Sequence, residues 1–322
     1  MRNRATIRAI VLCKTRIFEA LSKAEVFGIA NDMQDSRLSL AGAQSKTGWF
    51  LPRGKDAKKA GSGDWMLPLG SAPSTHIVKI ASTKHPDLPF NELICMTAAS
   101  AAGLEIARSE ASDTIPGAFF SERYDRIWSN EPPSMSGFDV PLRLHQEDFC
   151  QAVGWPSYMK YETRPDSCYM ALCGRLIREQ SSNVIADTQM FARQVMVDYA
   201  LGNCDSHLKN HSFLYSPSWR EKRLAPAYDI VCTTIMGYDH NLGIDIGDHR
   251  VIDGVTPEDF EFMSQDLHLP LKMIKNIAAE VAEEVSAQLA ELASATGDLG
   301  RVALKIQTDS VERMRVLEEF SA

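Results

Sequence analysis

The chain has 322 residues, of which 44% are hydrophobic and 24% charged, and its formal net charge is -8. This composition is typical of globular proteins and excludes the collagen-like, low-complexity and disordered classes. The acidic balance argues against a general nucleic-acid binder. No apolar run approaches the roughly 20 residues that a membrane-spanning helix needs, so we expect a cytoplasmic protein. At roughly 150 residues per domain, the length predicts two compact units.

Two groups of side chains receive an ordinary interpretation. The seven cysteines are scattered and include no C-x-x-C pair, which predicts buried free thiols rather than a zinc ribbon or a disulfide framework. Arg53, Lys55, Lys58 and Lys59 form a local basic patch, which we interpret as a solvated loop.

The first part of the chain predicts a strand-rich region. Helical spacing of apolar residues predicts a helix over 15–30, and residues 37–51 predict a strand, a glycine-containing turn and a second strand. Residues 53–74 have the composition of a loop. A short strand over 74–80 places Lys79 on the face opposite Val78 and Ile80. We expect a helix over 91–102 that ends near Gly103, and then a strand over 117–126.

After residue 126 helical patterns dominate, over 142–153, 187–201 and 269–295. The last of these carries one apolar stripe, formed by Ile274, Ile277, Val281, Val285, Leu289 and Leu292. Residues 211–215 and 222–226 predict a hairpin. We therefore expect an α+β protein with a small sheet-rich lobe (1–125), a larger helical lobe (126–322) and a hinge near Glu122 to Arg126.

The most informative stretch is residues 202–210, where Asp205 and Asn210 lie five residues apart, followed nineteen residues later by Asp229. Phosphoryl transfer requires these groups: one carboxylate accepts a proton from the attacking hydroxyl, while an amide oxygen and a second carboxylate hold Mg²⁺. By itself the pattern is weak, and an ordinary structural loop is the alternative.

Two further features favour phosphoryl transfer. Lys79 lies in an otherwise apolar strand, which is costly unless its ammonium has an anionic partner such as a nucleotide phosphate, with Glu92 to orient it. A strand-edge lysine that reaches solvent is the alternative. Residues 39–46 predict a strand, a glycine turn and a strand whose backbone N–H groups can cover phosphates, although they are not a Walker A sequence.

Competing motifs fail. His207 and His211 are four residues apart but lack the glutamate of H-E-x-x-H, and neither G-x-S-x-G nor G-x-G-x-x-G occurs. Arg123 and Arg126 are candidates for phosphate contacts or for surface ion pairs, and we favour an ion pair for Arg126.

Eight segments carry a further signal in their order and spacing: SLAGAQSK (39–46), STHIVK (74–79), NE (91–92), ERYDR (122–126), LHQEDFCQAVG (144–154), KYE (160–162), GNCDSHLKN (202–210) and LAPAYDIV (224–231). Together they resemble the HipA-type serine/threonine kinases of bacterial toxin–antitoxin systems. The resemblance extends over residues 37–295 and implies a divergent bilobal protein-kinase-like fold.

The resemblance also implies a role for each matching residue. Asp205 corresponds to the catalytic base, with His207 orienting the motif, and Asn210 and Asp229 to the Mg²⁺ ligands. The ATP contacts implied are Lys79, the glycine-loop residues Ala41, Gly42, Ala43, Gln44 and Lys46, the hinge residues Glu122 and Tyr124, and Asp125 at the ribose. Ser39 corresponds to a serine that such kinases autophosphorylate, and a charge of about -2 there would repel the ATP phosphates.

The function implied is an ATP- and Mg²⁺-dependent toxin kinase that phosphorylates an aminoacyl-tRNA synthetase and inhibits translation. A HipB-type helix-turn-helix antitoxin is the implied partner, through which the protein would contact DNA indirectly. The short stretch before Arg37 resembles the HipT-like branch, in which a separate small subunit replaces an N-terminal subdomain. The alternatives are a small-molecule kinase and a catalytically silent antitoxin-binding module. The presence of Lys79, Asp205, Asn210 and Asp229 argues against the silent module.

Overall fold

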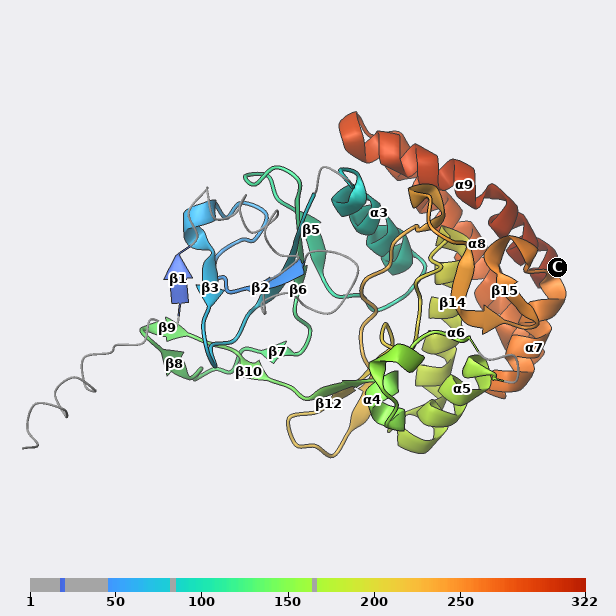
Figure 1. The fold of residues 1–322 in the computed structure, drawn as a ribbon, viewed down its shortest axis with the longest axis horizontal. Helices are drawn as coiled ribbons and strands as arrows, with labels where there is room; N and C mark the ends of the chain where they lie inside the picture. The colour runs from blue at the N-terminus through green and yellow to red at the C-terminus, as the bar shows by residue number, and fades with distance from the viewer. Residues whose placement is uncertain (1–17, 21–45, 82–84, 164–166) are drawn as a thin grey trace, which may run out of the picture. The chain divides into compact units, whose positions relative to one another are not determined.

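The computed structural model describes residues 18–20, 46–81, 85–163 and 167–322 (Figure 1). Within those residues, no helix has the length and apolar character to cross a membrane. The chain divides into two compact units: the first comprises residues 1–82 and 112–143, and the second comprises residues 83–111 and 144–322. Because each unit has its own core, the two are described separately.

The first unit is built from short strands. Its main sheet pairs β2 (Lys46–Trp49) with β4 (His76–Ile80), and β4 with β6 (Ala118–Glu122), all antiparallel. β1 (Phe18–Ala20) pairs with β3 (Met66–Pro68). Two smaller pairs follow, β7 (Arg126–Ile127) with β10 (Leu142–Arg143) and β8 (Ser134–Met135) with β9 (Phe138–Asp139).

An aromatic cluster forms the core of this unit. The rings of Trp65 and Phe120 stack with centroids 4.5 Å apart, and Trp49 meets Trp65 edge-on at 5.7 Å. Val78 and Ile80 of β4 pack into the same cluster. The core therefore packs on the face of β4 that carries Val78 and Ile80, as the alternating pattern of the strand predicts. Lys79 lies between these two residues in the strand.

The predicted strands of the first unit are largely confirmed. The strands expected around 46–51, 74–80 and 117–126 are β2, β4 and β6. The helix expected over 15–30 is wrong at Phe18–Ala20, which form β1 because they pair with β3. The basic patch is exposed, and three of its side chains form ion pairs, Lys55 with Asp64, Lys58 with Asp113 and Lys59 with Asp56.

The second unit is mainly helical. Its helices are α3 (Leu88–Ala101), α4 (Phe149–Val153), α5 (Tyr169–Gln180), α6 (Val184–Leu201), α7 (Pro257–Leu267), α8 (Leu271–Ala293) and α9 (Gly297–Ser321). Its strands are β5 (Ser109–Ala111), β11 (Gln146–Asp148), β12 (Ser212–Tyr215), β13 (Lys222–Leu224), β14 (Asn241–Ile246) and β15 (His249–Val251). β11, β12 and β13 form one antiparallel sheet, and β14 pairs with β15.

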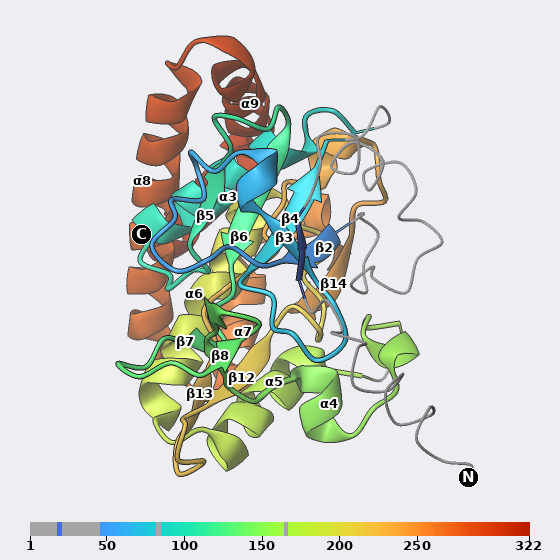
Figure 2. The ribbon, with the colours of Figure 1, turned by 90° about the vertical axis from the view of Figure 1, so that its left-hand side faces the viewer.

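Two long helices frame this unit. α8 and α9 lie side by side in both views (Figures 1 and 2), and α8 also packs on α3 and α6. The apolar stripe predicted for 269–295 is buried on α8, apart from the partly exposed Leu292. The stripe thus holds α8 against the helices that carry the site.

One helix expected after residue 126 needs correction. The helix predicted over 142–153 is helical only in α4, because residues 142–143 pair with β7 and residues 146–148 pair with β12. The boundary expected at residue 125 differs from the division into units, which places 126–143 with the strands and 83–111 with the helices. The predicted hairpin and the helices over 91–102 and 187–201 are confirmed as β12–β13, α3 and α6. Six described cysteines are free, five of them buried as expected and Cys168 exposed.

Candidate functional site

The loop that carries Asp205 begins where α6 ends. Gly202 closes the helix at φ +74°, a conformation that glycine adopts without strain. The buried carboxylate of Asp198, one turn earlier, accepts hydrogen bonds from Asn203 Nδ2 at 2.8 Å and Ser206 Oγ at 2.7 Å. Asn203 Oδ1 in turn accepts from the backbone N–H of Asp205 at 3.2 Å. Burial raises the pKa of Asp198 to about 7, so this anchor lies in a poorly solvated environment.

The Asp205 side chain is half exposed, and one of its oxygens is in use. Tyr161 Oη donates a hydrogen bond of 2.5 Å to Asp205 Oδ1. Burial, followed by this bond, raises the pKa of Tyr161, so the phenol keeps its proton at neutral pH. No described residue donates a hydrogen bond to Oδ2.

His207 lies at the centre of the cluster. Its Nε2 lies 2.8 Å from Lys160 Nζ and 3.9 Å from Asp205 Oδ1, and its ring meets that of Tyr161 edge-on with centroids 4.9 Å apart. Burial lowers the pKa of His207 to about 4; the carboxylates of Asp205 and Asp229 act against this and the Lys160 ammonium adds to it. The imidazole is therefore neutral at pH 7. Because an ammonium can only donate, Nε2 is the acceptor and the ring proton is on Nδ1, which is buried and has no hydrogen-bond partner among the described residues.

Asn210 and Asp229 are the other two predicted residues of this cluster. Asn210 is buried, its backbone N–H donates to the His207 carbonyl at 2.8 Å, and its Oδ1 lies 3.4 Å from the His207 backbone nitrogen. Asp229 has φ +62°, an uncommon conformation for a residue other than glycine. The hydroxyl of the preceding residue, Tyr228, donates to the Lys209 carbonyl at 2.8 Å, which attaches the segment before Asp229 to the 202–210 loop.

The segments on either side of the cluster are joined by hydrogen bonds. The Gly202 carbonyl accepts from the backbone N–H groups of Thr233 and Thr234, and Thr233 Oγ1 accepts from the Cys204 N–H at 2.9 Å. Two bonds between the Asn91 side chain and the Cys232 backbone, at 2.8 and 2.9 Å, attach the same segment to α3. Asp205 and Asp229 are therefore carried on two cross-linked segments.

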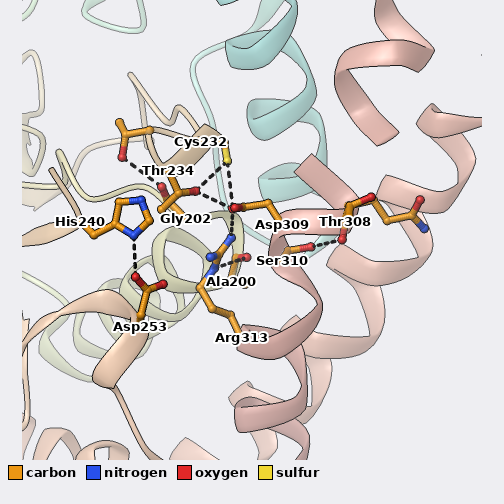
Figure 3. A network of polar contacts seen from close by, with 12 residues as sticks. Ala200, Gly202, Cys232, Thr234, His240, Asp253, Thr308, Asp309, Ser310 and Arg313 are labelled. Atoms are coloured by element: carbon orange, nitrogen blue, oxygen red, sulfur yellow. Dashed lines mark hydrogen bonds and ion pairs between the residues drawn. The ribbon is translucent and has the colours of Figure 1, made fainter. Parts of the chain in front are cut away.

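Side chains of helix α9 bind both the end of α6 and the segment that carries Thr234 (Figure 3). Asp309 Oδ2 accepts hydrogen bonds from Thr234 Oγ1 and Arg313 Nη2, both at 2.6 Å. The buried Arg313 also donates from Nε to the Ala200 carbonyl at 3.3 Å, in the last turn of α6.

The predicted ATP contacts of the first unit lie on its main sheet. Lys79 is 5% exposed in β4, and its Cα partner in β2 is Lys46. Glu122 ends β6, opposite His76, and Tyr124 follows it in the turn. The expected burial of Lys79 is confirmed, and its role toward a phosphate stays a prediction. Ser39, Ala41, Gly42, Ala43 and Gln44 lie outside the described residues.

Asp125 has two arginine partners. Arg123 donates to its two oxygens at 2.9 and 2.8 Å, and Arg126 Nη1 donates to Oδ2 at 2.6 Å. Although burial opposes ionisation, the two guanidinium groups hold the pKa of Asp125 below its ordinary value. The ion pair favoured for Arg126 is confirmed, but its side chain is buried rather than at the surface.

The oxygen donors of the second unit suit a hard divalent cation. Asp205, Asn210 and Asp229 offer carboxylate and amide oxygens, the ligands that Mg²⁺ prefers, together with few enough protein ligands to leave positions for phosphate oxygens. The described residues contain no group of three or more His, Cys, Asp or Glu side chains arranged to hold a metal by themselves.

Several residues that contact this cluster have no role predicted from the sequence. Lys160 and Tyr161 were noted only as part of KYE, although both side chains contact the catalytic loop. Asp198 is hidden inside the regular pattern of α6. An aspartate in the last turn of a helix, followed by an asparagine directly after the glycine cap, is a signal that draws attention to it.

Comparison with known proteins gives a consistent result. The family described as "HipA-like C-terminal domain" matches residues 38–289. The serine/threonine-protein kinase toxin HipA of Shewanella oneidensis is 28% identical over 273 residues, which cover 80% of this chain and 57% of that protein. The chain spans less than two thirds of the length of the curated relatives it matches.

Solved structures agree on the fold. The Shewanella oneidensis MR-1 complex of HipA, HipB and operator DNA contains a chain that is 23% identical, with a TM-score of 0.73 over 94% of this chain and 74% of that chain. The Helicobacter pylori proinflammatory kinase CtkA is 11% identical, with a TM-score of 0.50 over 76% of this chain and 90% of that chain. The expected α+β, kinase-like fold class is confirmed.

Proposed function

Because this chain belongs to the family of HipA-like C-terminal domains, we propose that it is an ATP- and Mg²⁺-dependent serine/threonine protein kinase. The observation that carries the proposal is the cluster around His207. Within one unit it combines a half-exposed Asp205 with a free carboxylate oxygen and the oxygen donors of Asn210 and Asp229. These are the groups that phosphoryl transfer asks of a protein.

Asp205 is the proposed general base. A serine or threonine hydroxyl would donate its hydrogen bond to Asp205 Oδ2 and lose its proton there as its oxygen bonds to phosphorus. The hydrogen bonds from Asn203 and Ser206 to Asp198 fix the loop that carries this carboxylate. The carboxylate of Asp205 then needs little movement to align the hydroxyl. Positioning of this kind is the main contribution that a kinase makes.

Asn210 and Asp229 are the proposed metal ligands. When bound, Mg²⁺ neutralises phosphate charge. The left-handed backbone at Asp229 and the anchor of Tyr228 on Lys209 hold one ligand in place, and the short bond to the His207 carbonyl holds the other. Lys79 is the proposed phosphate contact of the first unit, supported by its burial within a strand. Its site is completed by Lys46 and residues 41–44, with Glu122 and Tyr124 at adenine and Asp125 at the ribose.

The biological role proposed is that of a toxin in a bacterial toxin–antitoxin system, acting in the cytoplasm. A relative is named as a HipA toxin, and a structural neighbour is a complex of HipA with HipB and operator DNA. We propose a HipB-type antitoxin as partner, with DNA contacted only through it, and a further small subunit. The proposed substrate is an aminoacyl-tRNA synthetase, and the proposed self-modification site is Ser39.

Intact-mass analysis with peptide mapping tests the proposal. The purified chain is incubated with Mg-ATP beside the Asp205→Asn variant, which keeps the shape of the side chain and removes the base. We expect one or more added phosphates, mapped to Ser39, in the wild type only. If neither protein gains mass, and phosphatase-treated wild type also fails to bind ATP, the kinase proposal is wrong.

A further inference from the structure

Lys160 is a positive charge beside the catalytic carboxylate that the proposed mechanism has not used. It follows the 3-10 turn Ser157–Met159, and its backbone is attached to the catalytic loop, because its carbonyl accepts from the Leu208 N–H at 3.1 Å. Its side chain then turns to His207, with Nζ at 2.8 Å from Nε2, and lies 4.7 Å from the centre of the Tyr161 ring. The ammonium is thus held by one neutral acceptor and one aromatic face.

No carboxylate in the described part of the chain lies within ion-pair distance of Lys160. Lys209, which lies within the 202–210 loop itself, differs in this respect because its Nζ lies 2.5 Å from Asp148 Oδ2. Of these two lysines near Asp205, Lys209 has its charge balanced by a carboxylate of the described residues and Lys160 does not. A partly buried ammonium with only neutral contacts is suited to an anionic ligand.

The neighbours of Lys160 limit what that anion is. His207 Nε2 lies 2.8 Å from the ammonium and 3.9 Å from Asp205 Oδ1, so both groups lie close to the same imidazole nitrogen. In the proposed reaction, the anion beside this carboxylate and the metal ligands Asn210 and Asp229 is the phosphoryl group in transit. Its charge is spread over three equatorial oxygens, and a fixed cation there stabilises it.

We propose that Lys160 is a further catalytic residue whose ammonium binds the terminal phosphate of ATP and the phosphoryl group during transfer. This inference rests on the proposed kinase function. In the step, the substrate oxygen bonds to phosphorus as the bond from phosphorus to the oxygen of ADP breaks, and the hydroxyl proton passes to Asp205. Lys160 keeps its own protons throughout and contributes charge alone.

The two nucleotides of the reaction separate this role from a structural one. Because ADP lacks the phosphate that Lys160 binds, only ATP should lose affinity when the charge is removed. Lys160→Gln is the informative change, since it removes the charge and keeps a polar N–H donor on a slightly shorter side chain. We expect dissociation constants, measured by calorimetry with Mg²⁺, to rise about tenfold for ATP and to stay within about twofold for ADP.

Rates of phosphate incorporation complete the test. We expect Lys160→Gln to reduce the rate at saturating ATP by about a hundredfold, the effect of removing one preorganised charge-stabilising group. Lys160→Arg, which keeps the charge, should recover most of the rate and of the ATP preference. Lys209→Met serves as the matched control and should keep the ATP to ADP affinity ratio of the wild type, with thermal unfolding recorded for every variant.

The outcomes distinguish the two proposals. A wild type that binds neither nucleotide and incorporates no phosphate overturns the kinase function itself. An active wild type with an equally active Lys160→Gln variant, or with ATP and ADP weakened alike, overturns the role of Lys160 and leaves the kinase function standing. If Lys160→Gln fails to fold, Lys160→Arg decides: a loss of the ATP preference in a folded, charged variant contradicts a role based on charge.

Discussion

Substitution of Gly202, the glycine at the end of α6, tests how tightly the following loop is packed. Gly202 has φ +74°, and a Cβ there would overlap Thr234 Oγ1 and lie 2.7 Å from Arg313 Nη2. Both of those side chains donate to Asp309 (Figure 3). In Gly202→Ala the methyl group would therefore displace these two hydrogen bonds in addition to straining the backbone.

The expected loss of stability has two parts. A left-handed conformation costs an alanine roughly 1 kcal/mol. Moving Thr234 and Arg313 away from Asp309 adds about 2 kcal/mol, because partly buried hydrogen-bonding groups lose their partners. The sum of about 3 kcal/mol corresponds to a fall in Tm of roughly 6–12 °C for a unit of this size.

Gly154 provides a matched control. It ends α4 at the same φ of +74°, and nothing lies within 4 Å of a Cβ placed there. Gly154→Ala should therefore show only the backbone part, about 1 kcal/mol. Calorimetric unfolding of the full chain measures both variants. In the double variant Gly202→Ala with Thr234→Ala, the closest contact is removed, so the two changes should be less than additive. Equal losses at Gly202 and Gly154 would refute the reasoning.

Three other predictions test separate parts of the account. Arg313→Met should cost about 3 kcal/mol in urea unfolding, because it removes one partner of a largely buried ion pair; a loss below about 1 kcal/mol would contradict this role of the ion pair. The pKa of Asp198 is raised from 3.8 to about 7 in the folded state, so the folded protein binds this proton more tightly than the unfolded chain does. The contribution of this proton to the free energy of unfolding is complete below about pH 4 and is lost as pH rises through 7. Relative to Asp198→Asn, wild type should therefore lose stability between pH 5 and pH 8 in urea unfolding, and parallel pH dependences would exclude this. Lys79→Met should weaken ATP binding at least tenfold, the effect of losing about one charge-assisted hydrogen bond, without lowering Tm; unchanged affinity in calorimetry would remove Lys79 from the site.

Local patterns predicted the parts of the fold that depend on local sequence. The stripe of α8 and the alternation of β4 both reflect which face of one element meets a core, so their burial followed from residue spacing alone. The helix predictions over 15–30 and 142–153 are wrong at 18–20, 142–143 and 146–148. These short segments form strands whose partners lie elsewhere in the chain, at 66–68, 126–127 and 212–214. Pairing of this kind overrides a helical pattern and leaves no local signal.

The candidate site likewise has a part that local sequence predicts and a part that it does not predict. Asp205, His207 and Asn210 are close in sequence, and their contacts agree with the predicted grouping. The contacts of Lys160 and Tyr161 span 47 and 44 residues, so no spacing rule indicates them. The ion pairs of Asp125 are predictable, because its partners Arg123 and Arg126 are close to it in sequence and carry the opposite charge.

The central claim is that Asp205 serves as the base for phosphoryl transfer from ATP. The most direct test is the rate of ADP formation and phosphate incorporation by the full chain with Mg-ATP, comparing wild type with Asp205→Asn. Asp298→Asn, a change at an exposed aspartate of α9, is the matched control. The account predicts phosphate incorporation by the wild type and the control, and a loss of at least about a hundredfold in Asp205→Asn with nucleotide binding retained. Incorporation by Asp205→Asn at the wild-type rate would contradict it.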